Sequence, residues 1–249
     1  MTMPDDWYEI AFGQLYPAVY AHRDEAEAVR VARRLAALVA GASPVLDVAC
    51  GSGRYMTAFA QTGLEMFGVD LSEYMLTQAA LRRGVGERVV RCDMRALPFR
   101  DQVFGAALNM FTSFGYFDTD LDNVRVIHEV GRVLRPGGTF LLDFINAGSV
   151  QADALGSSQR RAGDATIDEA RWMEPGGKTL AKRVIYRPAL GVPVEYVERV
   201  RLYRLEDLRV MLESGGMAVR NVYGDYELGA FEETTSARLL IHSERTRER

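Results

Sequence analysis

Residues 45–55 read VLDVACGSGRY. The apolar start of this stretch predicts a short buried strand, the small residues after it predict a tight turn, and the segment from Arg54 onward predicts a helix. Gly51 and Gly53 leave the turn without side chains, so a ligand could lie against its backbone and near the free N–H groups of the helix start. A dinucleotide-binding turn has a third glycine where this chain has Met56, which makes a pyrophosphate a poorer fit.

A second acid supports ligand binding near this turn. Asp70 ends the next apolar run, in the segment GVDLS. Ligands of open parallel sheets bind beyond the carboxyl ends of the strands, and a carboxylate there can accept hydrogen bonds from both hydroxyls of a ribose. The turn and Asp70 together favour an adenosine-type ligand with an unphosphorylated ribose. Taken alone, the glycine turn is equally consistent with an α/β protein that binds nothing there.

The bulk composition sets limits on the function. The chain has 249 residues, 48% of them hydrophobic, which is enough for one large core with a small appendage. Its 30 basic and 34 acidic side chains give a net charge of −4, which argues against a protein that coats nucleic acid. Cys50 and Cys92 fit neither a disulfide framework nor a metal site, so no metal is expected. The absence of a signal peptide and of a membrane-spanning run predicts a cytoplasmic protein.

Short apolar runs alternate with amphipathic stretches over the first two thirds of the chain. We expect strands at 45–48, 65–69, 89–92, 104–109 and 140–144. Helices are expected at 54–61, at 72–83 with Ser72 as N-cap, and at 121–134, where the turn 135–138 (RPGG) ends the third helix. This alternation predicts a parallel sheet covered by helices on both faces.

The pattern changes after residue 150. Three strands are expected between 166 and 203, with turns at EPGG and RPALGVP, as an antiparallel insertion. A helix at 205–214 and strands at 217–223 and 237–242 follow. The predicted domains are an N-terminal helical lid (1–40), a ligand-binding domain (41–150 and 204–249) and a β insertion that covers the substrate pocket (151–203).

Four segments, DVACGSGRY, GVDLS, RCDMRALPF and LRPGG, occur in this order between residues 45 and 144. Together they resemble the class I S-adenosylmethionine-dependent methyltransferases of the small-molecule type. The resemblance implies an α/β fold with a doubly wound, mostly parallel seven-stranded sheet (Rossmann-like), an antiparallel insertion after strand five, and S-adenosyl-L-methionine as cofactor. Ala49 departs from the family pattern, because many members have a glycine there, although a small side chain should still admit the ligand.

The resemblance also implies a cofactor site. Asp70 would hold the ribose hydroxyls, and Asp93 would accept a hydrogen bond from the adenine amine, although Asp93 could instead cap a helix or a turn. The complete predicted cofactor site comprises Tyr16, Tyr20, Asp47, Ala49, Gly51, Gly53, Asp70, Leu71, Met75, Asp93, Met94, Asn109 and Met110.

Methyl transfer needs alignment and exclusion of water more than a strong acid. The aromatic loop 109–117 (NMFTSFGYF) follows strand four and supplies two predicted catalytic residues, Asn109 and Tyr116, unless its phenylalanines only fill the core. The segment FGQLYPAVY resembles the lead-in helix of small-molecule methyltransferases, including those that methylate sugar amines. This resemblance implies Tyr16 near the sulfonium, as the third predicted catalytic residue, and Tyr20 in a lid. Core packing is the alternative for these aromatics.

No histidine is assigned as a general base: His128 and His242 are expected to be structural, and the case for His22 is weak. A neutral amine acceptor needs no base before transfer. The insertion carries several arginines that could bind an anionic acceptor, or could be ordinary surface charge or part of a dimer contact.

The predicted function is methyl transfer to an N or O atom of a small molecule, by a monomer or homodimer. The alternatives are an RNA or protein methyltransferase, a non-catalytic sensor of S-adenosylmethionine, and, disfavoured by Met56, a nicotinamide-dependent oxidoreductase.

Overall fold

The structure is a computed structural model that describes residues 7–21, 24–150 and 155–247. The chain forms two compact units, one from residues 1–24 and 150–202 and the other from residues 25–149 and 203–249. The first is called the insertion unit below and the second the sheet unit. Residues 25–40 were expected to belong to the N-terminal lid (1–40). They lie in the sheet unit, where the helix α3 (Glu25–Leu35) packs against α4 (Arg54–Ala60).

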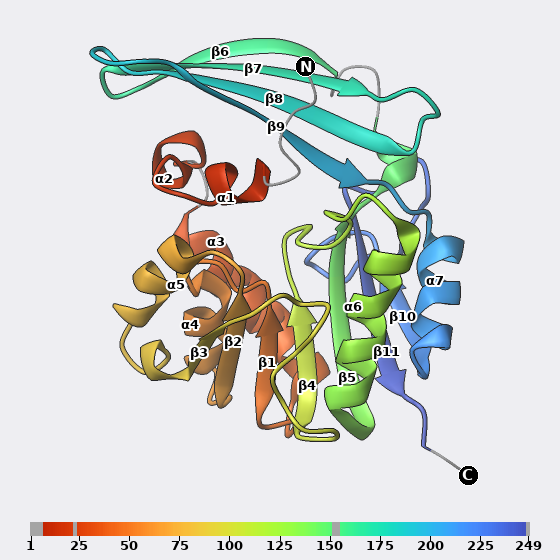
Figure 1. Cartoon of the computed structure of the whole chain (residues 1–249). Coiled ribbons are helices and arrows are strands. Elements are labelled where there is room, and N and C mark those ends of the chain that lie inside the picture. Colours follow the sequence, from red (N-terminus) through yellow and green to blue (C-terminus); the bar gives the residue numbers. More distant parts are fainter. Residues whose placement is uncertain (1–6, 22–23, 151–154, 248–249) are drawn as a thin grey trace. The chain divides into compact units, whose positions relative to one another are not determined.

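The sheet unit contains seven strands in the order β10-β11-β5-β4-β1-β2-β3 (Figure 1). The strands β1 to β5 run parallel, β11 lies antiparallel to β5, and β10 lies antiparallel to β11. The bounds are Val45–Val48 (β1), Met66–Asp70 (β2), Val89–Arg91 (β3), Phe104–Asn109 (β4), Leu134–Ile145 (β5), Met217–Tyr223 (β10) and Arg238–Arg245 (β11). The predicted doubly wound, mostly parallel sheet is thereby confirmed.

One expected boundary is wrong. The segment RPGG was expected to be a turn between helix and strand, but β5 already begins at Leu134. The register between β4 and β5 shifts from Phe104↔Leu134 to Ala106↔Thr139, so the extra residues bulge within the strand. Gly137, with a φ of 80°, supplies the left-handed backbone that this bulge needs.

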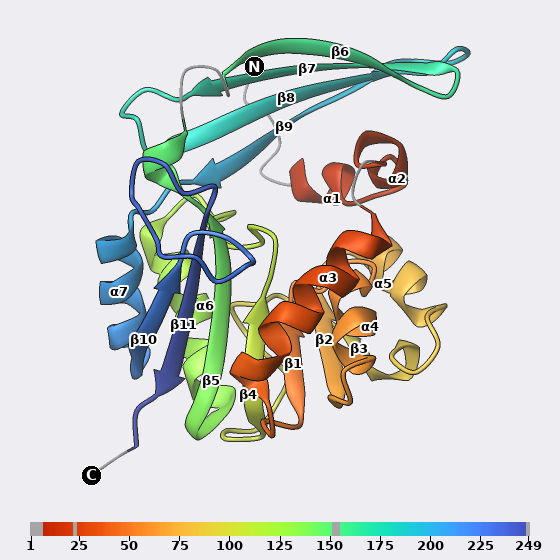
Figure 2. The ribbon, with the colours of Figure 1, turned by 180° about the vertical axis from the view of Figure 1, so that it is seen from behind.

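Helices cover both faces of this sheet. Figure 1 shows α6 and α7 in front of it, and Figure 2 shows α3 and α4 on the opposite face. The bounds are Glu25–Leu35 (α3), Ala36–Val39 (η1), Arg54–Ala60 (α4), Glu73–Ala80 (α5), Gly86–Arg88 (η2), Asp120–Val133 (α6), Ala147–Ser149 (η3) and Leu205–Ser214 (α7). The Ser72 hydroxyl accepts a hydrogen bond from the Met75 N–H at 3.1 Å, which confirms the predicted N-cap of α5.

The packing of α4 on β2 explains why position 56 needs no glycine. Met56 is fully buried. A Cβ added to Gly68 of β2 would lie 2.3 Å from the Met56 sulfur and 2.8 Å from the Cys50 sulfur. The small residue that lets helix and strand approach therefore sits on the strand, and the large residue on the helix fills the space.

The insertion unit contains two short helices and a four-stranded antiparallel sheet in the order β6-β7-β8-β9. The bounds are Trp7–Ala11 (α1), Tyr16–Val19 (α2), Gly156–Ala162 (β6), Ala165–Met173 (β7), Thr179–Arg187 (β8) and Val194–Arg201 (β9). Three strands were expected, and β6 was missed because its sequence, GSSQRRA, is polar and mostly exposed and has no alternating apolar face. The antiparallel insertion itself is confirmed.

No helix among the residues that the structure describes is long and apolar enough to span a bilayer. Within the same residues, no group of three or more His, Cys, Asp or Glu side chains is arranged to hold a metal ion.

Candidate active site

The candidate site lies at the carboxyl ends of the central strands of the sheet unit. The strand β1 pairs with β2 on one side and with β4 on the other, so the chain order reverses there. Such a switch point leaves a crevice beyond the strand ends. Asp47 lies near the end of β1, while Asp70 and Asn109 are the last residues of β2 and β4.

The turn between β1 and α4 has the left-handed backbone that its small residues permit. The φ angles are 58° at Ala49, 55° at Gly51 and 73° at Gly53. An alanine in this region is strained by roughly 1–2 kcal/mol, which explains why glycine is the commoner residue there. A Cβ added to Gly51 would meet nothing within 4 Å, so the turn is open at that residue. At Gly53 a Cβ would lie 3.3 Å from the Cβ of Ala79.

The Asp70 carboxylate fixes this turn to the end of β2. Its Oδ2 accepts a hydrogen bond from the Gly51 N–H at 2.8 Å, and its Oδ1 accepts one from the Ser72 N–H at 2.8 Å. Burial raises the pKa of Asp70, against the lowering effect of these backbone N–H groups. Since a carboxylate offers about four acceptor positions, Asp70 can accept further hydrogen bonds from a ligand.

Asp47 lies deeper in the same site and is 2% exposed. Burial, followed by repulsion from the Asp70 carboxylate, raises the pKa of Asp47 from 3.8 to about 8. Burial therefore favours the neutral form of the Asp47 carboxyl group. A cationic ligand at this site would favour its ionised form.

Asn109 has an acceptor oxygen that the fold leaves without a partner. The side chain is 1% exposed, and its Nδ2 donates to the carbonyl of Val48 at 3.0 Å. Its Oδ1 is buried and has no hydrogen-bond partner among the described residues. A buried amide oxygen in that state is costly unless a bound group donates to it. The neighbouring Met110 and, in α5, Met75 are 3% and 2% exposed.

The segment after β3 has a structural role that the sequence left open. The Asp93 carboxylate accepts hydrogen bonds from the Arg95 N–H at 2.8 Å and from its guanidinium at 2.6–3.1 Å, so Asp93 is a turn residue. Burial acts to raise the pKa of Asp93, but Arg95 outweighs it and the pKa lies below its usual value. Met94 and Leu71 are half-buried, and the Leu71 carbonyl accepts a hydrogen bond from Arg91 at 3.0 Å.

The loop after β4 combines a core contact with a strained backbone. Phe114 is fully buried and its ring contacts those of Phe144 and Tyr203, so this phenylalanine does fill the core. Phe111 and Thr112 both have a φ of 61°, unusual for two successive residues other than glycine. Tyr116 is half-buried.

The sequence did not point to the network of residues that contacts this loop. Asp143 of β5 is fully buried and binds Arg238 of β11 and Tyr226 of the segment between β10 and β11. An acid within the apolar run FLLDF is the signal that could have singled out Asp143. Its partners are separated from it by more than 80 residues and carry no local motif.

The predicted lid residues Tyr16 and Tyr20 belong to the insertion unit. Their ring centroids lie 4.8 Å apart. The Tyr20 hydroxyl donates to Glu198 and accepts a hydrogen bond from the Lys182 ammonium at 2.8 Å, so this hydroxyl connects the N-terminal segment to the strands β8 and β9. Contact of Tyr16 or Tyr20 with a cofactor stays a prediction.

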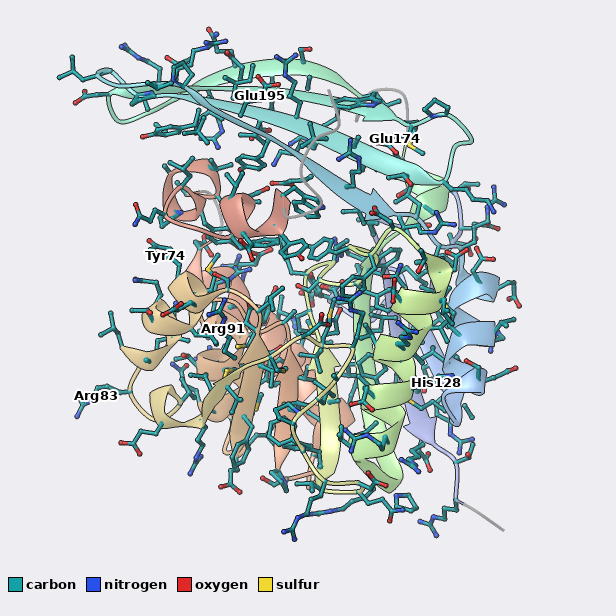
Figure 3. The ribbon with its side chains drawn as sticks, in the orientation of Figure 1. Tyr74, Arg83, Arg91, His128, Glu174 and Glu195 are labelled. Carbon is teal, nitrogen blue, oxygen red and sulfur yellow. The ribbon has the colours of Figure 1, made fainter. Side chains whose placement is uncertain are left out.

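Neither of the two histidines that the structure describes is among the residues of this site. His128 projects from α6, and its Nε2 lies 3.1 Å from the Ser214 hydroxyl (Figure 3). His242 lies in β11 and is half-buried, and burial lowers its pKa. His22 lies outside the described residues.

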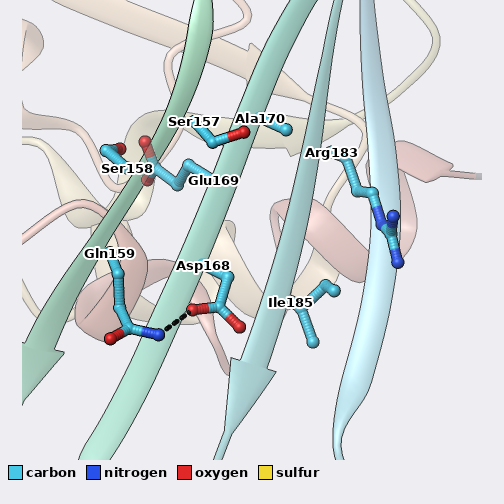
Figure 4. A pocket seen from close by; sticks show the side chains of 8 residues that line it. All are labelled: Ser157, Ser158, Gln159, Asp168, Glu169, Ala170, Arg183 and Ile185. Carbon is cyan, nitrogen blue, oxygen red and sulfur yellow. Dashed lines mark hydrogen bonds between the residues drawn. The ribbon is translucent and has the colours of Figure 1, made fainter.

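Two arginines of the insertion sheet form ion pairs with carboxylates of the same unit. Arg183 pairs with Glu195 and Arg199 pairs with Glu174, two carboxylates marked in Figure 3. A hollow of about 410 Å³ on this sheet contains no predicted site residue (Figure 4). Its Asp168 already accepts a hydrogen bond from Gln159 at 2.6 Å. The lining residues are Ser157, Ser158, Gln159, Asp168, Glu169, Ala170, Arg183 and Ile185.

Comparison with known proteins adds independent information. The family described as Methyltransferase domain matches residues 45–138. The chain is 30% identical over 225 residues to dTDP-3-amino-3,4,6-trideoxy-alpha-D-glucopyranose N,N-dimethyltransferase of Streptomyces venezuelae, a match that covers 77% of this chain and 94% of that protein. It is 35% identical over 101 residues to the Bacillus subtilis protein YqeM, a match that covers 40% of this chain and 41% of that protein.

Among solved structures, the CcbJ methyltransferase from Streptomyces caelestis superposes with a TM-score of 0.80 at 23% identity. That likeness covers 98% of this chain and 100% of the other, and at this identity it concerns the fold alone.

Proposed function

Because the chain belongs to the class I S-adenosylmethionine-dependent methyltransferases, we propose that it transfers a methyl group from S-adenosylmethionine to a nitrogen or oxygen atom of a small molecule. The observation that carries the proposal is the chemistry at one sheet edge. There the buried Oδ1 of Asn109 has no donor among the described residues, Asp70 can accept further hydrogen bonds, and the backbone at Gly51 is open. An adenosyl amino acid supplies donors of the kind that these groups require.

The proposed cofactor contacts follow from the resemblance to the methyltransferase family. Asp70 accepts hydrogen bonds from the ribose hydroxyls, and Leu71 lies against the adenine. The Asp93 carboxylate accepts a hydrogen bond from the adenine amine at a position that Arg95 leaves free. The Met94 N–H faces a nitrogen of the adenine ring. Asp47, Ala49, Gly51 and Gly53 surround the methionine part.

When bound, S-adenosylmethionine would supply a methyl group on a positively charged sulfur, so that a lone pair of the acceptor forms a bond to the methyl carbon as the carbon–sulfur bond breaks and the neutral thioether leaves in line. The protein's task is to align the acceptor and to exclude water from it. We propose that Asn109 and Tyr116 position the acceptor, and that the Tyr16 hydroxyl lies near the reacting centre. No side chain is assigned as a base, since an amine that arrives neutral needs none.

A nucleotide-linked amino sugar is the first acceptor to test, because the Streptomyces venezuelae relative is named for a dTDP-linked amino sugar. The mildly acidic chain, with a net charge of −4, supports a small acceptor over RNA. A cytoplasmic location and a monomeric or homodimeric state belong to this proposal.

The proposal is tested by incubating the full chain with S-adenosylmethionine and either a panel of dTDP-linked amino sugars and hydroxylated metabolites or unmodified tRNA. Mass spectrometry then detects methylated products. We expect a methylated small molecule and no methylated tRNA. Methylation of tRNA alone would overturn the small-molecule assignment. Failure to methylate either pool, while the chain still binds the cofactor, would favour a sensor.

A further inference from the structure

The turn at Phe111–Thr112 has a strained backbone that contacts with the surrounding structure must stabilise. Both residues have a φ of 61°, a left-handed conformation that residues with a Cβ avoid. Such backbone persists only where the surrounding structure fixes it, and it concentrates at functional sites. The turn begins two residues after Asn109, whose buried oxygen has no donor within the part of the chain that the structure describes. What holds the turn therefore also sets the approach to the candidate site.

One residue holds both strained amides. The Phe111 N–H donates to the Asp143 Oδ2 at 2.8 Å, and the Thr112 N–H donates to the Asp143 backbone carbonyl at 2.9 Å. Asp143 lies in β5, and Asn109 of β4 pairs with Leu142, the residue before it. Two successive residues of the turn are therefore hydrogen-bonded to one residue of β5, the strand next to β4.

The Asp143 carboxylate is itself held on both oxygens. Its Oδ2 also accepts a hydrogen bond from the Tyr226 hydroxyl at 2.7 Å, and its Oδ1 receives the Arg238 guanidinium at 2.7–2.8 Å. Asp143 is fully buried, so an unpaired charge there would be strongly destabilising. Burial and the Asp143 charge raise the pKa of Tyr226, which keeps its hydroxyl protonated as a donor.

Arg238 closes the network on the turn. Its Nη2 donates to the Thr112 hydroxyl at 2.9 Å, and its guanidinium lies 5.6 Å from the centre of the Phe111 ring. Asp143 outweighs the effect of burial and raises the pKa of Arg238, so the guanidinium stays charged. The turn is thus contacted through its amides, its hydroxyl and its ring.

We propose that Asp143, Arg238 and Tyr226 form a clamp of positioning residues that holds the Phe111–Thr112 turn in its left-handed conformation and so fixes the loop that follows Asn109. The clamp acts on the reaction through this loop. The inference rests on the proposed function for its effect on turnover, whereas its effect on the turn is independent of any activity.

The test uses Tyr226→Phe and Asp143→Asn in the full chain, with amide hydrogen exchange of residues 110–113 as the primary readout. Without the clamp, we expect these amides to exchange roughly tenfold faster or more, while those of β1 and β2 are unchanged. Tyr203→Phe is the matched control, because its hydroxyl also donates to a carboxylate, that of Asp120 at 2.8 Å. Unchanged exchange at 110–113 in Tyr226→Phe, the milder variant, would overturn the clamp.

A glycine at position 112 separates positioning from mere stability. Thr112→Gly lets the backbone adopt a φ of 61° without help. When Thr112→Gly is added to Asp143→Asn, we expect kcat to be at least about threefold higher than in Asp143→Asn alone, with KM little changed. A purely structural Asp143 predicts a lower Tm, an unaltered kcat and no rescue by glycine. If the wild-type chain neither binds S-adenosylmethionine nor methylates an acceptor, the proposed function fails, while the exchange data still decide on the clamp.

Discussion

The replacement Asp47→Asn tests the electrostatics of the candidate site. Asparagine has nearly the same shape but never ionises, so it removes the titration of Asp47 and little else. The carboxyl of Asp47 is 2% exposed, and burial with the nearby Asp70 charge raises its pKa from 3.8 to about 8. Between these two values the folded chain binds one proton that the unfolded chain has released.

The sign and size of the effect follow from proton linkage. A carboxyl whose folded pKa is raised contributes stability at low pH that is lost as the pH rises toward the folded value. The slope is about 1.4 kcal/mol per pH unit for one proton, so this residue alone removes about 3 kcal/mol between roughly pH 5 and 7. This slope requires only that the folded pKa lie above the range measured. Burial is the larger cause, so Asp70→Asn should leave most of the slope in place.

The assay is urea unfolding of the cofactor-free chain at a series of pH values, with circular dichroism as the measure of the folded fraction. We expect the stability of Asp47→Asn relative to the wild type to rise by about 1 kcal/mol or more for each pH unit across that range. Comparing the two proteins cancels the titration of other groups, including His242, whose pKa is lowered by burial. Parallel stability curves for the two proteins would refute the raised pKa.

Three further substitutions test the packing of α4 on β2, the backbone strain at Ala49 and the hydrogen bond of Tyr20. In Gly68→Ala the new Cβ would lie 2.3 Å from the Met56 sulfur, so we expect a loss of about 1–3 kcal/mol in urea unfolding; an unchanged midpoint would contradict the close packing of α4 on β2. Ala49→Gly relieves a φ of 58° at the cost of backbone entropy, so stability should stay equal or rise by up to about 1 kcal/mol, and a marked loss would mean that the residue is not strained. Tyr20→Phe removes the hydroxyl that Lys182 contacts and should lower Tm while faster amide exchange appears at residues 16–20; a lost affinity for S-adenosylmethionine with unaltered exchange would instead place Tyr20 at the cofactor.

Much of the fold could be predicted because it is encoded locally. The strand, turn and helix of residues 45–61 have distinct apolar periods, and Ser72 is a cap whose hydrogen bond spans three residues. Where the local signal is weak, the prediction is wrong. The strand β6 has no apolar face, and the residues RPGG form a bulge whose pairing depends on β4.

The candidate site likewise has features that could be predicted from the sequence and features that could not. Asp47, Asp70 and Asn109 could be placed at one sheet edge because parallel strands end together. The raised pKa of Asp47 and the burial of the Asn109 oxygen, which has no partner among the described residues, depend on distant segments that no short motif contains. The clamp brings Asp143 together with Tyr226 and Arg238, which lie 83 and 95 residues later in the sequence, so only the folded chain reveals it.

Calorimetric titration of S-adenosylmethionine into the wild type and into Asp70→Asn tests the central claim most directly. The asparagine oxygen can still accept the backbone bond from Gly51 or Ser72, so the turn has a partner while the charge is gone. If Asp70 holds the ribose, the loss of charged hydrogen bonds should weaken binding at least about tenfold. An affinity equal to that of the wild type, with the variant fully folded, would contradict the placement of the cofactor at this edge of the sheet.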